Sequence, residues 1–243
     1  MKIDIMGVLF DNVTMDEAIS QGVELIRAHK GAYCVTPNAE IAWEAMHDEA
    51  FRGIVNGADL VLPDGAGVVM GAKILNRPLK QKVAGIEFAD HLAEYLSKNQ
   101  GRLYLLGSKP GVAELAGEKL CQKYPGLTIC GTADGYFKDD GPVIEKINEA
   151  KPDVLFVCLG APKQEKFMVA HREELDVGLM IGLGGSLDGF AGNVKRAPRW
   201  MIRCNLEWLY RLAKEPKRLG RMMRLPKFVL ACKKQHRQEA KNG

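Results

Sequence analysis

Four polar side chains follow apolar runs in this sequence, and one of them, Asp64, is of a type that can do acid–base chemistry. Thr36 and Asn38 directly follow one apolar run, and Asp64 follows another. Gln164 lies just beyond a third apolar run. A general base needs a defined position more than an unusual pKa, and Asp64 is held between a proline and a glycine. The same residue types also cap helices, so capping is the alternative role for Asp64, Thr36 and Asn38.

Residues suited to binding a nucleotide or a sugar phosphate follow several of the apolar runs. They are Gly107, Tyr136, Lys163, Gly184, Gly185 and Asp188. Small residues let a ligand approach the backbone closely, and helix N-termini offer unpaired N–H groups to an anion. Each junction taken alone also fits ordinary turn chemistry, and Asp188 is equally suited to stabilising a loop. The combination, rather than any one residue, indicates a phosphate-bearing ligand.

Two glycine-rich segments fail as dinucleotide-binding fingerprints. Gly65, Gly67 and Gly71 have a spacing one residue longer than usual, and Leu187 occupies the third glycine position of the second segment. The sequence also lacks a D-x-D pair for a metal–diphosphate, and its histidines have no metal-ligand spacing. We therefore expect no NAD, no metal and no other cofactor.

The elements that would hold these residues alternate along the chain. Helical patterns follow apolar runs of strand length, with one helix expected at about residues 15–30 and another at about residues 39–56. Thr14 and Glu17 have the spacing of a capping box at the start of the first helix. Several apolar runs lack the alternation of a half-exposed strand. This pattern predicts an α/β fold: a Rossmann-like parallel sheet with helices on both faces, plus a basic helical C-terminal appendage.

Charge divides the chain into two regions. The net charge is +4, yet the residues from Lys195 onward hold 15 of the 34 Lys and Arg residues and only 3 of the 30 acidic residues, a local net charge of +12. From Arg199 this region is also helical in pattern and rich in Trp and Leu. We expect an α/β catalytic domain at residues 1–195 and a basic amphipathic helical appendage at residues 196–243. Such an appendage implies an anionic partner: nucleic acid, a membrane or phosphate.

Cysteine usage and hydropathy indicate the compartment. Six scattered cysteines without a C-x-x-C pair predict free thiols in a reducing cytoplasm. The N-terminus lacks the apolar region of a signal peptide, and no run approaches the roughly 18 uncharged residues of a membrane span. We expect a cytoplasmic protein that is at most peripheral to a membrane.

Four longer segments are similar to the WecG/TagA/CpsF family of glycosyltransferases. They are TPNAEIAWEA, LPDGAGVVMGAKILNRPL, LGAPKQEKF and GLGGSLDGFAGNVKRAPRWMIRCNLEWLYRLAKEPKRLGR, and the resemblance runs in one order from about Val35 to Arg224. It is greatest to the TagA branch, which acts in wall teichoic acid synthesis. The resemblance implies inverting, metal-independent transfer of N-acetylmannosamine from UDP to the 4-hydroxyl of N-acetylglucosamine on undecaprenyl diphosphate.

The resemblance also implies roles for individual residues. Asp64 corresponds to the proposed catalytic base of the family, and Thr36, Asn38 and Gln164 correspond to residues at its active site. Tyr136 and the glycines at 184 and 185 match the region that faces the nucleotide.

Basic residues complete the site that the resemblance implies. Arg211, Arg218 and Arg221 of the appendage would close over the diphosphate, whose negative charge grows as UDP leaves. Lys82 stands where relatives often have arginine, which keeps the charge but not the bidentate geometry. The implied partners are a UDP-sugar, a lipid-diphosphate-GlcNAc acceptor and an anionic membrane, on the inner face of the bacterial cell membrane. Off the membrane, an apolar appendage predicts self-association into a homo-oligomer.

Three alternatives stay open from the sequence alone. A relative that uses UDP-glucose or UDP-N-acetylmannosaminuronic acid, in exopolysaccharide or enterobacterial-antigen-like synthesis, would carry the same motifs. A nucleotide-binding module with a nucleic-acid-binding tail would need polar helices, whereas Trp200, Trp208 and Leu212 favour a membrane surface or a lid. An oxidoreductase is disfavoured by the failed fingerprints. Because the apolar residues of the tail favour a membrane surface or a lid, we expect no nucleic acid partner.

Overall fold

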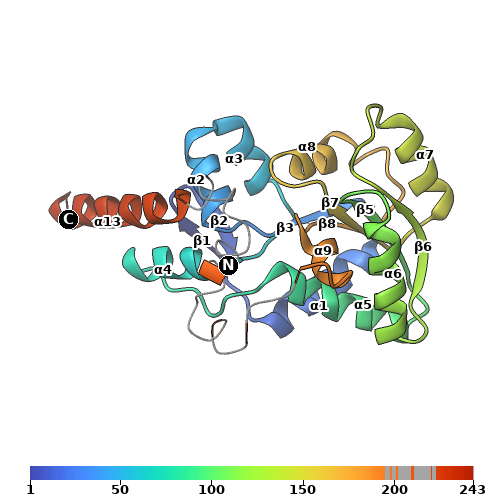
Figure 1. The fold of residues 1–243 in the computed structure, drawn as a ribbon. Coiled ribbons are helices and arrows are strands. Elements are labelled where there is room, and N and C mark those ends of the chain that lie inside the picture. The colour runs from blue at the N-terminus through green and yellow to red at the C-terminus, as the bar shows by residue number, and fades with distance from the viewer. Residues whose placement is uncertain (195–197, 199–200, 202–208, 211–219, 221–222, 243) are drawn as a thin grey trace.

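The computed structural model describes residues 1–194 and 223–242, with residues 198, 201, 209, 210 and 220 between them (Figure 1). In chain order, the elements of this described part are β1 (Lys2–Ile5), β2 (Val8–Asp11), α1 (Met15–Ala28), β3 (Ala32–Val35), α2 (Ala39–His47), α3 (Glu49–Asn56), β4 (Leu60–Val61), α4 (Ala66–Ile74), α5 (Gly85–Lys98), β5 (Arg102–Gly107), α6 (Val112–Lys123), β6 (Thr128–Ala133), α7 (Gly141–Ala150), β7 (Val154–Cys158), α8 (Lys163–Ala170), β8 (Leu179–Gly182), α9 (Ser186–Phe190) and α13 (Arg224–Asn242).

Six strands form one sheet in the order β4-β3-β8-β7-β5-β6, and each neighbouring pair is parallel. β3, β7 and β8 are buried along their whole length, as expected for strands covered on both faces. Helices α2, α3, α7 and α8 cover one face, and α1, α5, α6 and α9 cover the other (Figure 1). The predicted α/β fold with a parallel sheet is therefore confirmed.

Neighbouring strands leave the sheet toward opposite faces. β5 continues into α6 and β8 into α9 on one face, whereas β7 continues into α8 and β3 into α2 on the other. Where neighbouring parallel strands diverge in this way, a crevice opens outside their carboxyl ends. The loops that carry the candidate site residues leave the sheet at this edge.

The side chains of Thr14 and Asp48 are the N-caps that start α1 and α3. Thr14 Oγ1 accepts from the Glu17 N–H at 3.3 Å while Glu17 Oε2 accepts from the Thr14 N–H at 2.8 Å, so the predicted capping box is confirmed. The prediction of a single helix at residues 39–56 is wrong, because this region forms two helices. Asp48 accepts from the Phe51 N–H at 2.9 Å and caps a new helix, which separates α2 from α3.

β1 and β2 form an antiparallel hairpin that we did not expect from the sequence. Met6 and Gly7 at its turn have positive φ angles of 59° and 84°, the conformation of two-residue turns whose twist matches that of the strands. The Leu9 N–H donates to Asn56 Oδ1 at 2.9 Å, which attaches the hairpin to the end of α3.

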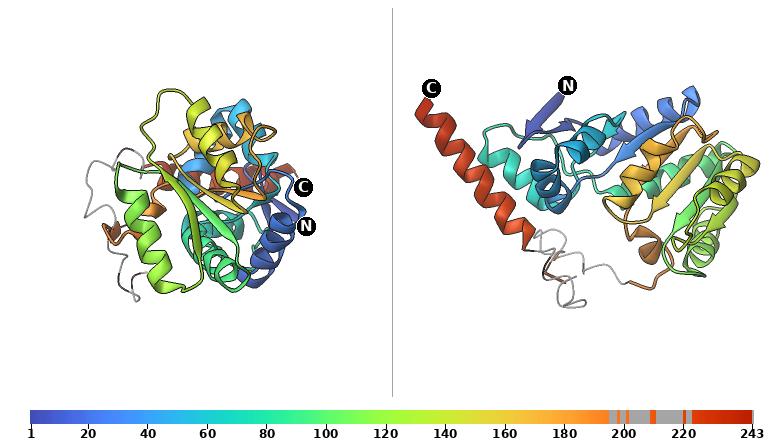
Figure 2. Two further views of the ribbon diagram at one scale, coloured as in Figure 1. Left: turned by 90° about the vertical axis from the view of Figure 1, so that its right-hand side faces the viewer. Right: turned by 90° about the horizontal axis from the view of Figure 1, so that it is seen from above.

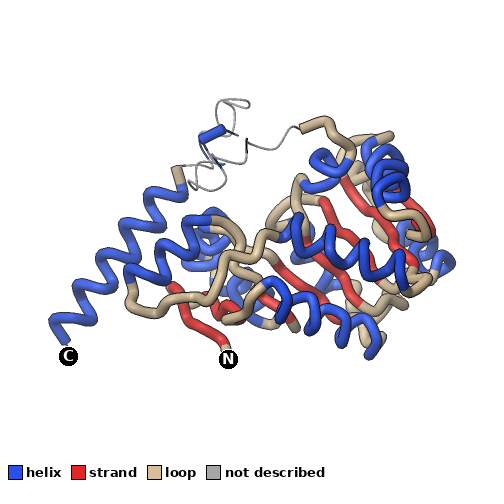
Figure 3. The backbone as a smooth tube through the Cα atoms, turned by 90° about the horizontal axis from the view of Figure 1, so that it is seen from below, coloured by secondary structure: helices blue, strands red, loops and turns tan. Residues whose placement is uncertain are grey.

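The described end of the basic C-terminal region is a helix that packs on the rest of the protein. α13 lies along α4 and α2, at the end of the molecule away from α6 and α7 (Figure 2 and Figure 3). Phe228 and Cys232 of this helix are fully buried. A helical C-terminal segment is thus confirmed for residues 224–242, whereas a domain boundary near residue 195 stays a prediction. Within the described residues, no helix is long and apolar enough to cross a membrane.

Candidate active site

A hollow of about 300 Å³ lies at the carboxyl ends of β5, β6 and β7. It is lined by Ser108, Lys109, Gly135, Tyr136, Cys158, Leu159, Lys163 and Asp188. Three residues predicted to bind a nucleotide (Tyr136, Lys163 and Asp188) therefore meet here, although they lie on loops far apart in the sequence. The hollow coincides with the point where β5 and β7 diverge, which is the expected ligand position in an open α/β sheet.

Gly107 and Ser108 shape one wall of this hollow. Gly107 has a φ of 128°, and a side chain there would collide with the carbonyl of Cys158, so only glycine fits. The Ser108 N–H donates to that same carbonyl at 3.2 Å. Ser108 Oγ donates to Asp188 Oδ2 at 2.9 Å. Asp188 thus ties the exit of β5 to α9, in agreement with its alternative role in stabilising a loop.

Lys163 and Tyr136 supply a positive charge and an exposed ring. Lys163 Nζ donates to the Gly135 carbonyl at 3.2 Å and lies 4.5 Å from the centre of the Phe137 ring. Tyr136 is 68% exposed, and its N–H donates to Asp134 Oδ1 at 2.8 Å, which fixes the loop. An ammonium beside an exposed aromatic ring can pair with a phosphate while the ring stacks on a base or a sugar.

Thr36 and Gln164 meet at the exit of β8. Thr36 Oγ1 donates to the Gly182 carbonyl at 2.9 Å, and Gln164 Oε1 accepts from the Gly184 N–H at 2.8 Å. Both side chains are buried, with exposed fractions of 7% and 2%. They hold the glycine-rich segment in place. In this structure the hydroxyl of Thr36 bonds β8 rather than capping α2.

Gly184 and Gly185 form an open stretch of backbone beside these two side chains. A Cβ at either position would meet nothing within 4 Å. Gly184 also has a positive φ of 55°. Exposed backbone of this kind allows a ligand to come close, as predicted for a nucleotide-facing segment.

Asp64 and Asn38 lie next to one another at the carboxyl ends of β4 and β3. The Asp64 N–H donates to the Pro37 carbonyl at 3.3 Å, and a Cβ on Gly65 would lie 3.6 Å from Asn38 Cβ. Asn38 Oδ1 accepts from two N–H groups in the first turn of α2, at 2.9 and 3.1 Å, so its capping role is confirmed. Gly65, not Asp64, is the N-cap residue of α4.

Lys82 lies in the segment that joins α4 to α5. The neighbouring Val83 N–H donates to the Pro63 carbonyl at 3.0 Å, which links this segment to the Asp64 loop. The Lys82 side chain is half-buried. The three arginines predicted to close over the diphosphate lie outside the described residues: Arg211, Arg218 and Arg221.

Glu165 is a buried carboxylate of this site that we missed in the sequence. It is 1% exposed; its Oε1 accepts from Gln164 Nε2 at 2.9 Å, and its Oε2 has no hydrogen-bond partner among the described residues. Burial raises the pKa of the Glu165 carboxyl, the hydrogen bond from Gln164 lowers it, and the Glu44 carboxylate raises it further. No pattern signalled this position, because a glutamate in a helix is ordinarily exposed.

Cys158 lines the hollow but is not a reactive nucleophile. Its side chain is 5% exposed, and burial raises the pKa of its thiol to about 12, so the thiolate is not formed near neutral pH. Each cysteine within the described residues is free. Those residues also contain no group of three or more His, Cys, Asp or Glu side chains that could hold a metal ion.

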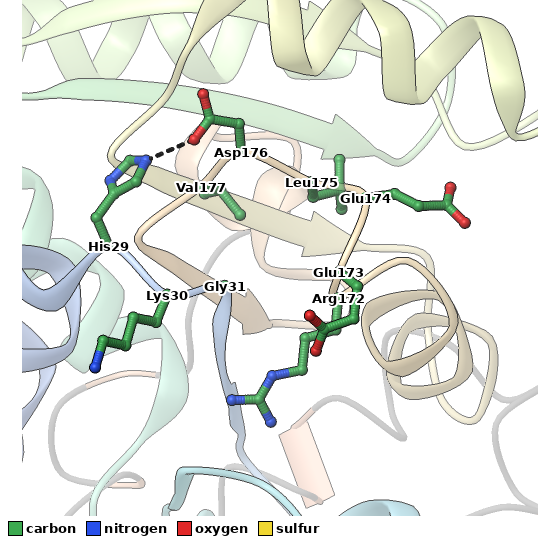
Figure 4. A pocket seen from close by; sticks show the side chains of 9 residues that line it. All are labelled: His29, Lys30, Gly31, Arg172, Glu173, Glu174, Leu175, Asp176 and Val177. Atoms are coloured by element: carbon green, nitrogen blue, oxygen red, sulfur yellow. Dashed lines mark hydrogen bonds and ion pairs between the residues drawn. The ribbon is translucent and has the colours of Figure 1, made fainter.

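A second hollow, of about 410 Å³, lies at the opposite edge of the sheet, before β3 and β8 (Figure 4). His29 Nε2 and Asp176 Oδ1 pair there at 3.0 Å, and Arg172 Nη2 pairs with Asp59 at 3.0 Å. None of the predicted site residues lines it. We assign the candidate site to the smaller hollow, because the strand ends and their polar side chains converge there.

Comparison with known proteins gives a consistent result. The chain matches the glycosyl transferase WecG/TagA/CpsF family model over residues 3–242. An N-acetylglucosaminyldiphosphoundecaprenol N-acetyl-beta-D-mannosaminyltransferase from Bacillus spizizenii is 41% identical over 213 residues, 88% of this chain and 83% of that protein. The protein of that name from Bacillus subtilis is 42% identical over 207 residues, 85% of this chain and 81% of the relative. The Staphylococcus aureus (strain MW2) protein of that name is 35% identical over 239 residues, 97% and 94% of the two chains.

The family match covers both the α/β sheet with its polar edge and the C-terminal helix α13. This chain belongs to the WecG/TagA/CpsF family of glycosyl transferases.

Proposed function

We propose that this chain is an N-acetylglucosaminyldiphosphoundecaprenol N-acetyl-beta-D-mannosaminyltransferase. The reaction moves N-acetylmannosamine from UDP to the lipid-linked N-acetylglucosamine, a step in making the teichoic acid linkage unit. The observation that carries the proposal is the 35–42% identity, over 85–97% of this chain, to three proteins of that name. The hollow at the carboxyl ends of the strands supports it, because its exposed ring and its lysines suit a nucleotide sugar.

Asp64 is the general base of the proposed reaction. It takes the proton of the acceptor 4-hydroxyl as that oxygen attacks the sugar carbon, while UDP leaves from the opposite face and the configuration inverts. The backbone bonds of the Asp64 and Pro63 peptides support this role by fixing the loop. The side-chain oxygen of Asn38 caps α2, so in the proposal its side-chain N–H groups donate to a substrate.

Cationic side chains stabilise the leaving group. The diphosphate gains negative charge as the glycosidic bond breaks, and in a metal-independent reaction lysines, arginines and backbone N–H groups must meet that charge. Lys109 and Lys163 both line the hollow, and Lys82 is next to the Asp64 loop. Arg211, Arg218 and Arg221 complete this set in the proposal.

The lipid acceptor calls for contact with a membrane, and α13 has a suitable surface. Lys227, Leu230, Lys234 and Arg237 are exposed and spaced three or four residues apart, so they form one stripe away from buried Phe228. Basic and apolar side chains together suit the headgroup region of an anionic bilayer. In the proposal, residues 196–243 attach the catalytic domain, residues 1–195, to the inner face of the cell membrane. When the protein is off the membrane, self-association covers the apolar side chains of residues 196–243.

The test is a donor screen with the purified chain and a lipid-diphosphate-GlcNAc analogue, in which released UDP is measured. UDP-N-acetylmannosamine should give acceptor-dependent release well above UDP-GlcNAc, UDP-glucose and UDP-N-acetylmannosaminuronic acid. A preference for one of the last two would replace the proposed donor. The absence of acceptor-dependent release with every donor would reject the proposed activity.

A further inference from the structure

Two glycines of α4 pack against side chains of α13. They belong to the segment that does not fit a dinucleotide fingerprint. Gly67 and Gly71 are four residues apart and therefore lie on one side of the helix. A Cβ on Gly67 would overlap the side chain of Leu225 in α13, and it would lie 2.8 Å from the Cβ of Ala39 in α2. Gly67 is thus the point where the starts of three helices meet.

Gly71 makes the same kind of contact one turn further along. A Cβ there would lie 2.8 Å from Phe228 Cε1 and 3.0 Å from Cys232 Sγ. Phe228 and Cys232 are both 0% exposed, although they belong to a helix near the end of the chain. The two glycines therefore form a groove in α4 that the side chains of α13 fill.

Two ion pairs fix the register of α13 in this groove. Arg224 Nη1 lies 2.8 Å from Glu44 Oε2 of α2, at the start of α13. Near its other end, Glu239 Oε1 lies 2.9 Å from Nη2 of Arg77, just beyond α4. Both pairs are partly exposed, so we attribute the docking mainly to the buried apolar contacts.

The groove begins three residues after Asp64. Because Gly67 is wedged between Ala39 and Leu225, the position of α13 determines how closely the start of α4 approaches the start of α2. The hydrogen bond from the Asp64 N–H to the Pro37 carbonyl, at 3.3 Å, depends on how close these two helix starts are. A change in the docking of α13 is thus transmitted to the Asp64 loop by direct contact.

We propose that Leu225 and Phe228 are positioning residues for Asp64, because they fill the glycine groove of α4 and hold the Asp64 loop against the start of α2. The inference rests on the proposed role of Asp64 as the base. It makes the membrane-facing helix a structural support of the catalytic loop. A misplacement of about 1 Å can lower a rate by about 100-fold, so small movements of α13 have large effects on turnover.

The test is Gly71→Ala in the full chain. The added methyl meets Phe228 and Cys232 but removes no apolar surface, and alanine favours the helical conformation of α4. We expect faster alkylation of Cys232 by iodoacetamide, mapped by mass spectrometry, and faster hydrogen exchange in residues 62–70. We also expect kcat to fall at least about tenfold while the Kd for UDP stays unchanged.

Two further variants separate this effect from general damage. Gly117→Ala makes the same substitution inside α6, where the methyl would lie 3.4 Å from Ile129, an ordinary contact, and it should behave as the wild type. Phe228→Leu combined with Gly71→Ala makes room for the methyl and should recover most of the lost kcat, a non-additivity expected of residues in contact.

Unchanged exchange at residues 62–70, or unchanged kcat, in a Gly71→Ala chain whose Cys232 has become reactive would overturn the inference. If the wild-type chain transfers no sugar, the proposed function fails instead. Hydrogen exchange then still decides whether α13 positions the Asp64 loop.

Discussion

Replacing Glu165 by glutamine should change how the stability of the protein depends on pH. The wild-type carboxyl is 1% exposed, accepts one hydrogen bond from Gln164, and has no hydrogen-bond partner at Oε2 among the described residues. The Glu44 carboxylate also opposes its ionisation and raises the pKa of Glu165. Glu165→Gln keeps the acceptor for Gln164 and removes the ionisation.

The direction of this change in stability with pH follows from the pKa of the Glu165 carboxyl, which is raised mainly by burial. At a pH below the unfolded-state pKa of 4.5, the carboxyl is neutral in both states and ionisation costs nothing. As the pH rises through that value, the unfolded chain loses the proton first. The wild type then loses stability relative to the variant by up to about 1.4 kcal/mol per pH unit, until the folded carboxyl also ionises. Above that point the difference is constant.

Urea unfolding of both proteins from pH 4 to pH 8 measures this difference. The amide brings N–H groups whose lack of partners would cost about 1–3 kcal/mol at every pH, so the informative quantity is the change with pH and not the absolute value. The difference in unfolding free energy, variant minus wild type, should rise from pH 4 and then level off. A difference that stays flat over this range would refute the reasoning, because it would mean that Glu165 ionises as easily in the folded protein as in the unfolded chain.

Three further predictions concern the chemistry and its supports. Asp64→Asn should lower kcat by about two to four orders of magnitude and leave the calorimetric UDP affinity unchanged, since it removes only the proton acceptor; a normal kcat would exclude Asp64 as the base. Thr36→Val should lower the free energy of unfolding in urea by about 1–3 kcal/mol, because the Gly182 carbonyl loses a buried donor, and Thr36→Ser should recover most of it. Turnover should persist in excess EDTA, and a loss that manganese or magnesium restores would demonstrate a metal requirement.

Local signals in the sequence were sufficient for the sheet and for the edge that holds the site. Apolar runs without alternation predicted buried strands, and in a parallel sheet their carboxyl ends share one edge. That reasoning alone brings Tyr136, Lys163 and Asp188 together, as the hollow confirms. The capping box at Thr14 was equally local, because both of its hydrogen bonds lie within four residues.

Neighbouring residues with similar chemistry could not be ranked from the sequence. Thr36 and Asn38 both qualify as caps, and the choice depends on backbone direction: Asn38 is extended, with φ −92° and ψ −176°, and faces the first turn of α2. Asp48 was overlooked for a related reason, since the helical pattern continues across it while its side chain begins a new helix. The turn at Met6 and Gly7 lacks the Asn-Gly or Asp-Gly signal that predicts most such hairpins.

Long-range contacts were beyond any local pattern. Glu165 is buried because α8 packs against β3, β7, β8 and α3, which no spacing within α8 reveals. Its neighbour Gln164 was identified from its position just beyond an apolar run and from the family resemblance.

The basic tail illustrates how one segment can serve two partners. Its charge predicted an anionic partner, and its apolar residues together with that charge favoured a membrane surface or a lid. In the structure, part of the apolar content has another partner: Leu225 and Phe228 fill the groove made by Gly67 and Gly71. The stripe that remains exposed on α13 is therefore mainly basic, with Leu230 as its apolar member. In the proposed function, a helix divided in this way contacts the bilayer with one side while the other side holds the Asp64 loop, which would tie the placement of the proposed base to contact with the lipid.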